Sequence, residues 1–174
     1  MANSASSEKG AASLLHGLRC GLGMDVHAFA KGRKLILGGV EIPHEVGLDG
    51  HSDADVLAHA VSDALLGAAR AGDIGKLFPD TDPAYKDADS LRLLSEVADH
   101  IRSLGFAILD VDAVLAAQAP KLSPYRDQMR ENLACAMAIP VENVGVKATT
   151  TEHLGFVGRE EGICAYATCL VMKE

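Results

Sequence analysis

The sequence predicts a mixed α/β fold of the α+β type, a single domain with a mixed four-to-five-stranded sheet and helices packed on one face. The chain has 174 residues, enough for one domain with a full core and few for two. Its content of 48% hydrophobic and 23% charged residues is typical of a globular protein. Strand-like and helix-like stretches follow one another in the rough order ββααβαββ, which favours helices packed on an antiparallel-containing sheet.

The first segment, residues 1–18, is rich in Ala, Ser and Gly and has no apolar region of signal-peptide length. We expect a mobile N-terminal extension here, followed by one domain over residues 19–174. No stretch approaches the length of a transmembrane helix. We therefore expect a cytoplasmic bacterial protein without a membrane partner, and leave a plastid-type organelle open.

The expected strands are rich in apolar residues and alternate with period 2. They are Leu18–Met24, Lys34–Ile42 with a break at Gly38-Gly39, Phe106–Gln118, Asn143–Ala148 and Gly162–Met172. The expected helices have apolar residues at helical spacing. They run from Ser52 to Arg70, from Ser90 to Leu104, and from Ser123 to Ala138.

Helix ends are predicted from capping residues. Ser52 is the expected N-cap of the first helix, with Asp53 and Asp55 in its first turn and Gly72 after its end. Ser123-Pro124 resembles a cap followed by proline at the first helical position. The segment 73–86 has neither period and is expected to be a long loop, a place where function is often found.

Asp25 and His27 lie two residues apart, so their side chains point the same way if the segment is extended. His59, on the first predicted helix, can supply a third ligand to a divalent metal. Two imidazoles and one carboxylate leave a coordination position open, as in catalytic zinc sites. Asp55, His59 and Asp63 form one polar row, so a carboxylate of this row is placed to orient His59. The alternatives are a polar loop beside a capped helix and a solvated helix face.

The net charge of −8, without a Lys/Arg cluster, argues against nucleic acid as a partner. An acidic protein that binds an anionic substrate must neutralise it locally with metal, backbone N–H groups and a few cations. Cys164 and Cys169 nominally fit a zinc spacing, but an odd separation along a strand puts them on opposite faces. Free thiols in a reducing compartment are therefore expected.

Five blocks of sequence, in order and covering Arg19 to the C-terminus, resemble the 2-C-methyl-D-erythritol 2,4-cyclodiphosphate synthases of non-mevalonate isoprenoid synthesis. They are Arg19-x-Gly-x-Gly-x-Asp25-Val-His27-x-Phe29, His51-Ser-Asp-x-Asp-x-x-x-His59, Gly72-Asp-Ile-Gly-Lys-Leu-Phe-Pro-Asp-Thr-Asp82, Ala117-Gln-Ala-Pro-Lys121 and Val146-Lys-Ala-Thr-Thr-Thr-Glu152-x-Leu-Gly-Phe156-x-Gly-Arg159.

The resemblance implies a phosphorus-oxygen lyase. The 2-phosphate of 4-diphosphocytidyl-2-C-methyl-D-erythritol 2-phosphate attacks the β-phosphorus, which closes the cyclic diphosphate and releases CMP. It implies one Zn²⁺ per subunit on Asp25, His27 and His59, and Mg²⁺ or Mn²⁺ on Glu152. His51 and Thr150 would stabilise the transition state, and Asp73 would accept hydrogen bonds from the sugar.

The substrate-binding residues implied by the resemblance fall into three groups. Ser52 would bind phosphate, and the residues next to Asp73 would hold the erythritol, namely Ile74, Gly75, Phe78, Pro79, Asp80, Thr81 and Asp82. A cytosine pocket would be lined by Ala117, Gln118, Ala119, Pro120, Lys121, Leu122 and Ser123. Thr149 and Thr151 would close over the diphosphate.

The resemblance also implies a homotrimer whose active sites are shared between adjacent subunits. An isoprenoid diphosphate is a further expected ligand on the threefold axis, with Phe156 lining the channel and Arg159 gripping the diphosphate. The alternative for Arg159 is an ion pair with Glu160 or Glu161, or with an acid across the subunit interface. Cys20, Met24 and His153 depart from the usual pattern without touching an expected ligand.

Two other functions share these residues. A metal-dependent phosphohydrolase would use the same Asp/His/His site, and an isoprenoid-binding trimer would have lost catalysis. Five matched blocks favour cyclisation over hydrolysis, and the intact acids and histidines argue against a lost activity.

Overall fold

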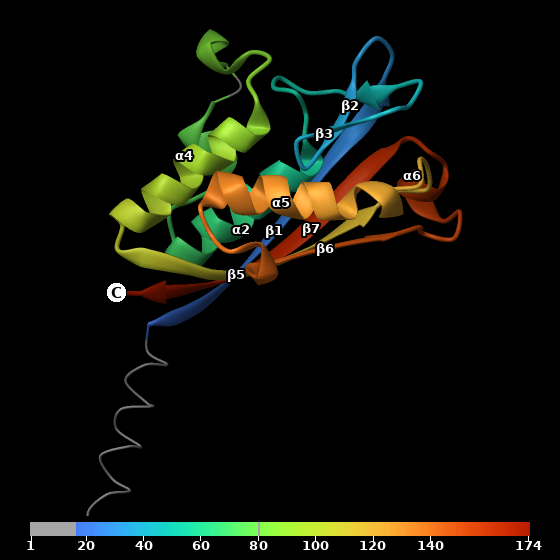
Figure 1. Ribbon diagram of the computed structural model, residues 1–174. Helices are drawn as coiled ribbons and strands as arrows, with labels where there is room; N and C mark the ends of the chain where they lie inside the picture. Colours follow the sequence, from blue (N-terminus) through green and yellow to red (C-terminus); the bar gives the residue numbers. More distant parts are fainter. Residues whose placement is uncertain (1–16, 80) are drawn as a thin grey trace, which may run out of the picture.

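A computed structural model describes residues 17–79 and 81–174. The predicted extension therefore lies almost wholly outside the described residues, as does Asp80. The main sheet has five strands in the order β4-β1-β7-β5-β6 (Figure 1). Only the β5–β6 pair is parallel, and the other neighbours are antiparallel. The strands of this sheet are β1 (Leu18–Ala30), β4 (Gly47–Leu48), β5 (Phe106–Ala116), β6 (Val144–Thr149) and β7 (Gly162–Lys173).

A separate hairpin and the helices complete the fold. The hairpin pairs β2 (Leu35–Leu37) with β3 (Val40–Ile42). The helices are α2 (Val56–Ala69), α3 (Ile74–Leu77), α4 (Ser90–Ser103), α5 (Arg126–Met137) and α6 (Gly155–Gly158), with 3₁₀ turns at Pro83–Tyr85, Ser123–Tyr125 and Val141–Asn143. The single mixed five-stranded sheet with helices confirms the predicted fold class. None of the helices in the described part of the chain is long and apolar enough to cross a membrane.

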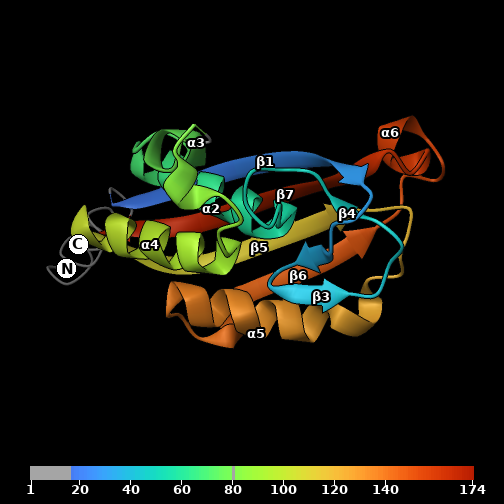
Figure 2. The same cartoon turned by 90° about the horizontal axis from the view of Figure 1, so that it is seen from above.

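The two faces of the sheet differ in what covers them. On β7, Ile163, Ala165 and Val171 are fully buried against the helices, and α2 lies across β1 and β7 (Figure 2). The opposite face of β1 and β7 is open and apolar, with Leu22 68% and Met24 51% exposed. Helices therefore pack on one face, as the sequence predicts.

Two glycines of β1 allow helix α2 to approach the sheet closely. A Cβ atom on Gly21 would lie 1.9 Å from the Ala64 carbonyl oxygen, and one on Gly23 would lie 2.0 Å from that of Ala60. No side chain fits into these gaps, so the helix backbone rests directly on the strand. This contact sets the distance between α2 and the side chains that follow Gly23 on β1.

The start of α2 corrects one prediction. Asp55, not Ser52, is the N-cap, and its side chain accepts the N–H groups of Leu57 and Ala58. It also accepts the N–H groups of Gly38 and Gly39 at 2.9 and 2.7 Å. Gly38 and Gly39 have positive φ and form the turn that breaks the predicted 34–42 strand into a hairpin. A carboxylate can accept from four N–H groups at once, whereas a serine hydroxyl is too short to join the helix to the hairpin.

Other boundaries also differ from the predictions. Helix α2 ends at Ala69 with Arg70 as its left-handed C-cap, close to the predicted end, so Arg70 and not Gly72 takes the capping conformation. A 3₁₀ turn over Ser123–Tyr125 precedes α5, so Ser123 is not the cap of an α-helix. The predicted 73–86 loop contains α3 and a 3₁₀ turn, and α6 was not predicted. Helices of one turn carry too few residues to show a period.

Candidate metal centre and substrate pockets

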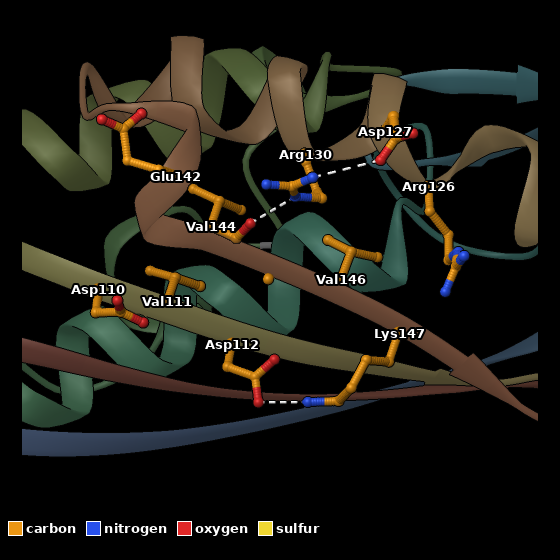
Figure 3. Close-up of a pocket in the computed structure, with 11 residues that line it drawn as sticks. Asp110, Val111, Asp112, Arg126, Asp127, Arg130, Glu142, Val144, Val146 and Lys147 are labelled. Atoms are coloured by element: carbon orange, nitrogen blue, oxygen red, sulfur yellow. Dashed lines mark hydrogen bonds and ion pairs between the residues drawn. The ribbon is translucent and has the colours of Figure 1, made fainter.

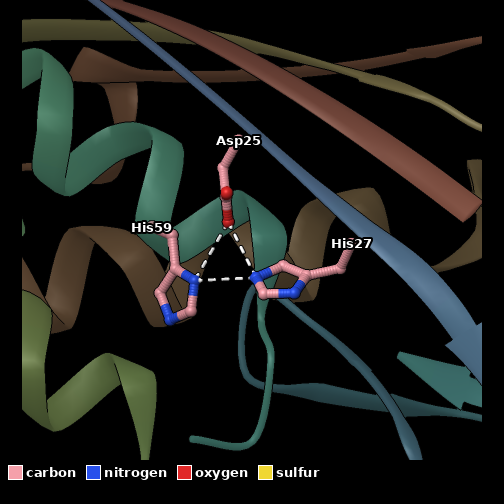
Figure 4. Close-up of side chains that lie close together, drawn as sticks. All are labelled: Asp25, His27 and His59. Carbon is pink, nitrogen blue, oxygen red and sulfur yellow. Dashed lines mark hydrogen bonds and ion pairs between the residues drawn. The ribbon is translucent and has the colours of Figure 1, made fainter. Parts of the chain in front are cut away.

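Strand β1 and helix α2 bring the three predicted metal ligands together (Figure 4). Asp25 and His27 are both on the face of β1 that meets α2, which confirms the period-2 argument. Asp25 Oδ2 lies 3.0 Å from His27 Nε2 and 3.0 Å from His59 Nδ1, and the two nitrogens are 3.2 Å apart. The three ligand atoms thus form a nearly equilateral triangle.

The triangle has the size and chemistry of a divalent-metal site. Ligands at tetrahedral zinc, with bonds near 2.0–2.1 Å, are separated by roughly 3.3 Å, close to the observed spacing. His27 Nδ1 lies 2.5 Å from the carbonyl oxygen of Asp49, so this nitrogen donates its hydrogen and leaves the Nε2 lone pair facing the triangle. The side chains of Asp25, His27 and His59 are 26%, 18% and 13% exposed, so an open coordination position can reach a ligand. These residues fit a divalent cation.

The interactions within the triangle favour the ionised form of the Asp25 carboxyl group. Burial alone would raise the pKa of Asp25, but hydrogen bonds and charge from His27 and His59 outweigh it and hold that pKa well below its usual range. Burial opposes the charged form of His27, yet Asp25 and the Asp49 carbonyl raise the pKa of this imidazole. The site therefore attracts positive charge.

Neither Asp55 nor Asp63, the carboxylates four residues from His59 on the helix, orients the His59 imidazole as predicted. The Asp55 side chain caps α2 and binds the hairpin, and Asp63 Oδ1 accepts the N–H of Ile74 at 2.8 Å. His59 Nε2 instead contacts the hydroxyls of Ser90 and Ser52, at 2.9 and 3.2 Å. The prediction was wrong because i, i+4 spacing ignores the loops that come to the helix end.

The triangle opens into a cavity of about 450 Å³ between β1, α2, α3 and α4. Its lining includes the predicted residues His51, Ser52, Ile74, Gly75 and Phe78. Gly50, Tyr85 and Leu93 also line it and were missed, because nothing in their local pattern distinguishes them. Asp73 does not line this cavity: it is the N-cap of α3, with Oδ1 accepting the Lys76 N–H. His51 Nε2 lies 3.2 Å from the Asp82 carbonyl oxygen, so the 81–82 segment borders the site.

Asp63 positions the α3 end of this cavity. Its bond to the Ile74 N–H fixes the first residue of α3 against α2. Burial raises the pKa of Asp63, and the hydrogen bond from Ile74 opposes that shift. Asp63 is therefore a half-buried residue that anchors the Ile74-Gly75 segment and not one of the three metal ligands.

A second cavity of about 300 Å³ contains the predicted cytosine-pocket residues. It is lined by Ala117, Gln118, Ala119, Pro120, Lys121, Leu122, Ser123, Ala148, Thr149 and Thr150. None of these residues lines the cavity beside the triangle. Each of the two groups of predicted site residues therefore lines a cavity of its own. Within one chain the two cavities are separate.

The remaining predicted residues lie beyond Thr149. Thr150 Oγ1 donates to Glu152 Oε1 at 2.9 Å, and Glu152 and His153 both have positive φ. The His153 N–H donates to the Gln118 side chain at 3.2 Å, which ties this turn to the second cavity. Thr151 Oγ1 donates to the Leu154 carbonyl at 2.7 Å, and Phe156 lies on α6.

Arg159 makes a two-point ion pair with Glu161, with N–O distances of 2.8 and 3.0 Å. This is the alternative that the sequence left open for Arg159. Pro79 and Thr81 are placed in the loop after α3 but do not line either cavity.

Another hollow, of about 550 Å³, lies away from these residues, along β6 and α5 (Figure 3). Two of its cations have partners within the chain. Arg130 pairs with Asp127 and donates to the Val144 carbonyl, and Lys147 pairs with Asp112. Within the described residues the one cluster of possible metal ligands is the triangle, and none of its members lines this hollow.

An α+β domain with an Asp/His/His cluster that could hold a divalent cation, open to a cavity, has the features of a candidate metal-dependent enzyme. The chain belongs to the YgbB family, whose model matches residues 18–172. A 2-C-methyl-D-erythritol 2,4-cyclodiphosphate synthase of Chlorobaculum tepidum is 58% identical over 154 residues, covering 88% of this chain and 98% of the relative. The resemblance inferred from the five blocks is confirmed.

Solved structures agree. The bifunctional IspDF of Campylobacter jejuni has a TM-score of 0.87 at 44% identity, over 90% of this chain and 42% of that one. A 2C-methyl-D-erythritol-2,4-cyclodiphosphate synthase in its CDP-bound form has a TM-score of 0.80 at 38% identity, over 88% of this chain and 99% of that one.

Proposed function

We propose that this chain converts 4-diphosphocytidyl-2-C-methyl-D-erythritol 2-phosphate to 2-C-methyl-D-erythritol 2,4-cyclodiphosphate and releases CMP. The observation that carries the proposal is the triangle of Asp25, His27 and His59, opening beside His51 and Ser52 in a chain of the YgbB family. The nucleophile and the leaving group belong to one substrate, so the protein has to hold both ends and neutralise charge.

The reaction needs little proton transfer. An oxygen of the 2-phosphate, already an anion near neutral pH, forms a bond to the β-phosphorus. The bond from that phosphorus to the bridging oxygen breaks, and CMP leaves with the electron pair without any water being consumed. Zn²⁺ held by Asp25, His27 and His59 would neutralise charge on a β-phosphate oxygen.

This chain's own residues then have distinct roles. The hydroxyl of Ser52 and the imidazole of His51 face the cavity and would donate hydrogen bonds to the phosphates. The backbone of Ile74 and Gly75, fixed by Asp63, would hold the erythritol. Thr150 would donate to the phosphate in the transition state. Glu152, which now accepts from Thr150, would hold Mg²⁺ or Mn²⁺ brought with the substrate.

We further propose a homotrimer in which the second cavity of one subunit completes the site of its neighbour. Two observations support it. The cavities share no lining residue within one chain, and the face of β1 and β7 opposite the helices exposes Leu22, Met24, Val26, Tyr166 and Leu170 together. The cytosine would then lie among Ala117–Ser123 of the adjacent subunit. The cytoplasmic location and the axial isoprenoid diphosphate stay predictions, the latter requiring Arg159 to reach a ligand while paired with Glu161.

The reaction is tested by incubating the purified chain with its substrate in ¹⁸O-water with zinc and magnesium. Phosphorus NMR should show the cyclic diphosphate and CMP, neither carrying the label. A linear phosphate product that contains ¹⁸O would instead identify a metal-dependent phosphohydrolase.

The shared site is tested by mixing an Asp25→Ala chain with a Glu152→Ala chain. Each variant alone should be inactive, and exchange of subunits should restore some activity, because a fraction of interfaces then pairs two intact halves. No recovery after mass spectrometry has verified mixed trimers would contradict the shared site.

A further inference from the structure

The nitrogen of His59 that faces away from the triangle also has partners. Nε2 lies 2.9 Å from Ser90 Oγ and 3.2 Å from Ser52 Oγ, while Nδ1 faces Asp25 (Figure 4). Ser90 is the first residue of α4, 31 positions from His59 in sequence, and only 1% of it is exposed. The imidazole is therefore held on both edges, and solvent does not reach the Ser90 contact.

The direction of the hydrogen bonds follows from Asp53. The Ser90 hydroxyl donates to Asp53 Oδ1, and the Ser90 N–H donates to Asp53 Oδ2 at 3.1 Å. A carboxylate only accepts hydrogen bonds, so the single hydroxyl hydrogen of Ser90 points to Asp53. The Ser90 oxygen is left as an acceptor for His59 Nε2–H. The proton of the neutral ring is then on Nε2, and the Nδ1 lone pair faces the triangle.

Ser52 has a different place in this network. Its oxygen accepts the Ala54 N–H at 3.1 Å, and it lies 3.4 Å from Ser90 Oγ. Ser90 Oγ accepts the hydrogen of His59 Nε2, because it lies closer to that nitrogen than Ser52 Oγ does. Within this network the Ser52 hydroxyl can then donate only to Ser90 Oγ, over the long distance of 3.4 Å. It remains able to donate to a phosphate in the cavity.

We propose that Ser90, backed by Asp53, is a positioning residue that fixes the rotation and tautomer of His59 as a metal ligand and leaves the Ser52 hydroxyl free for substrate. The inference rests on the proposed metal site. The carboxylate that orients His59 is then Asp53, which acts through the Ser90 hydroxyl at the start of α4. The sequence suggests Asp55, at the N-terminus of the helix that carries His59. The contact also joins the starts of α2 and α4, so the ligand geometry depends on both.

A merely structural role would give a different result from a positioning role. Loss of a buried hydroxyl lowers stability wherever it occurs, but only the partner of a ligand changes affinity for the metal. Ser62 offers a matched control, because it is fully buried on the same helix as His59 and its hydroxyl donates to the Ala58 carbonyl at 2.8 Å. This bond stays within α2 and does not involve Asp25, His27 or His59.

The test compares Ser90→Ala, Ser90→Thr and Ser62→Ala in the full chain. Zinc affinity is measured by competition with a chromophoric chelator, and thermal melting is measured on the metal-free proteins. Ser90→Ala should bind zinc about 10–100-fold more weakly, as for other partners of metal-ligating histidines. Ser90→Thr, which keeps a hydroxyl, should recover most of that loss. Ser62→Ala should lower the melting temperature without changing zinc affinity more than about twofold, since its hydroxyl bonds only its own helix.

Two outcomes would overturn the inference alone. Zinc affinity of Ser90→Ala equal to that of the wild type would show that Ser90 does not position His59. Equal loss in Ser90→Ala and Ser62→Ala would show a general effect of stability. A wild-type protein that binds no zinc, with Asp25→Ala indistinguishable from it, would instead remove the metal site and this inference together.

Discussion

Replacing Gly23 by Ala should move helix α2 away from the metal ligands of β1. The new Cβ would lie 2.0 Å from the Ala60 carbonyl oxygen and 2.6 Å from the Ala64 nitrogen. Ordinary contact needs about 3.4 Å, so helix and strand must separate by roughly 1 Å or more. His59 precedes Ala60, so its Nδ1 would leave the 3.0 Å distance to Asp25.

The cost has two parts. Overpacking of a tight contact costs about 1–3 kcal/mol of the free energy of unfolding, which for a chain of this size lowers the melting temperature by roughly 2–12 °C. Displacement of one ligand should also weaken zinc binding. The assay is thermal melting in chelator, followed by zinc competition on the folded variant.

Gly67→Ala on the same helix is the control. Its Cβ would meet nothing closer than the Leu22 carbonyl oxygen at 3.9 Å, and alanine in a helix interior is favoured over glycine by about 0.5–1 kcal/mol. Gly67→Ala should therefore melt at or above the wild-type temperature with zinc affinity unchanged. A Gly23→Ala protein with wild-type melting and wild-type zinc affinity would refute the close-approach argument.

Three further predictions concern the cap, the open face and the thiols. Asp55→Ala should lower the free energy of unfolding, measured by chemical denaturation, by about 1–3 kcal/mol, because four N–H groups lose their acceptor. Asp89→Ala should cost less, because the Asp89 side chain caps α4 by accepting only one N–H group. In the proposed homotrimer, Leu22→Lys on the open face should shift the mass measured by light scattering to that of a monomer, whereas Leu104→Lys, at the end of α4, should not; a trimeric Leu22→Lys protein would contradict burial of this face. Burial raises the pKa of the Cys169 thiol to about 11, so native Cys169 should resist alkylation at pH 8 while exposed Cys135 reacts. Because the folded pKa lies above the unfolded value, this thiol's contribution to stability should be present below pH 9 and decrease as pH rises toward 11, and rapid native labelling of Cys169 at pH 8 would contradict its burial.

The sequence predicts the parts of the site that depend on local periodicity. Alternation along a strand places Asp25 and His27 on one face, and helical spacing places His59 in a polar row beside the apolar stripe of its helix. The same parity puts Cys164 and Cys169 on opposite faces of β7, and both are buried and free. These inferences need only the geometry of one element.

Contacts between distant segments could not be predicted in this way. Ser52 and Asp55 are both residue types that favour the N-cap position. Asp55 is the N-cap in the structure because its carboxylate also accepts the N–H groups of the Gly38-Gly39 turn. Ser90 reads as an ordinary start of a helix, and its contact with His59 exists only because α4 begins beside α2. Asp63 is one of several acids on a helix until the Ile74 N–H comes to it.

The most direct test of the metal centre is anomalous diffraction at the zinc edge from crystals grown with zinc. We expect one peak per chain about 2.0–2.2 Å from Asp25 Oδ2, His27 Nε2 and His59 Nδ1, with a fourth position not taken by a side chain of the same chain. A peak elsewhere, or ligation through His59 Nε2 in place of Nδ1, would contradict it.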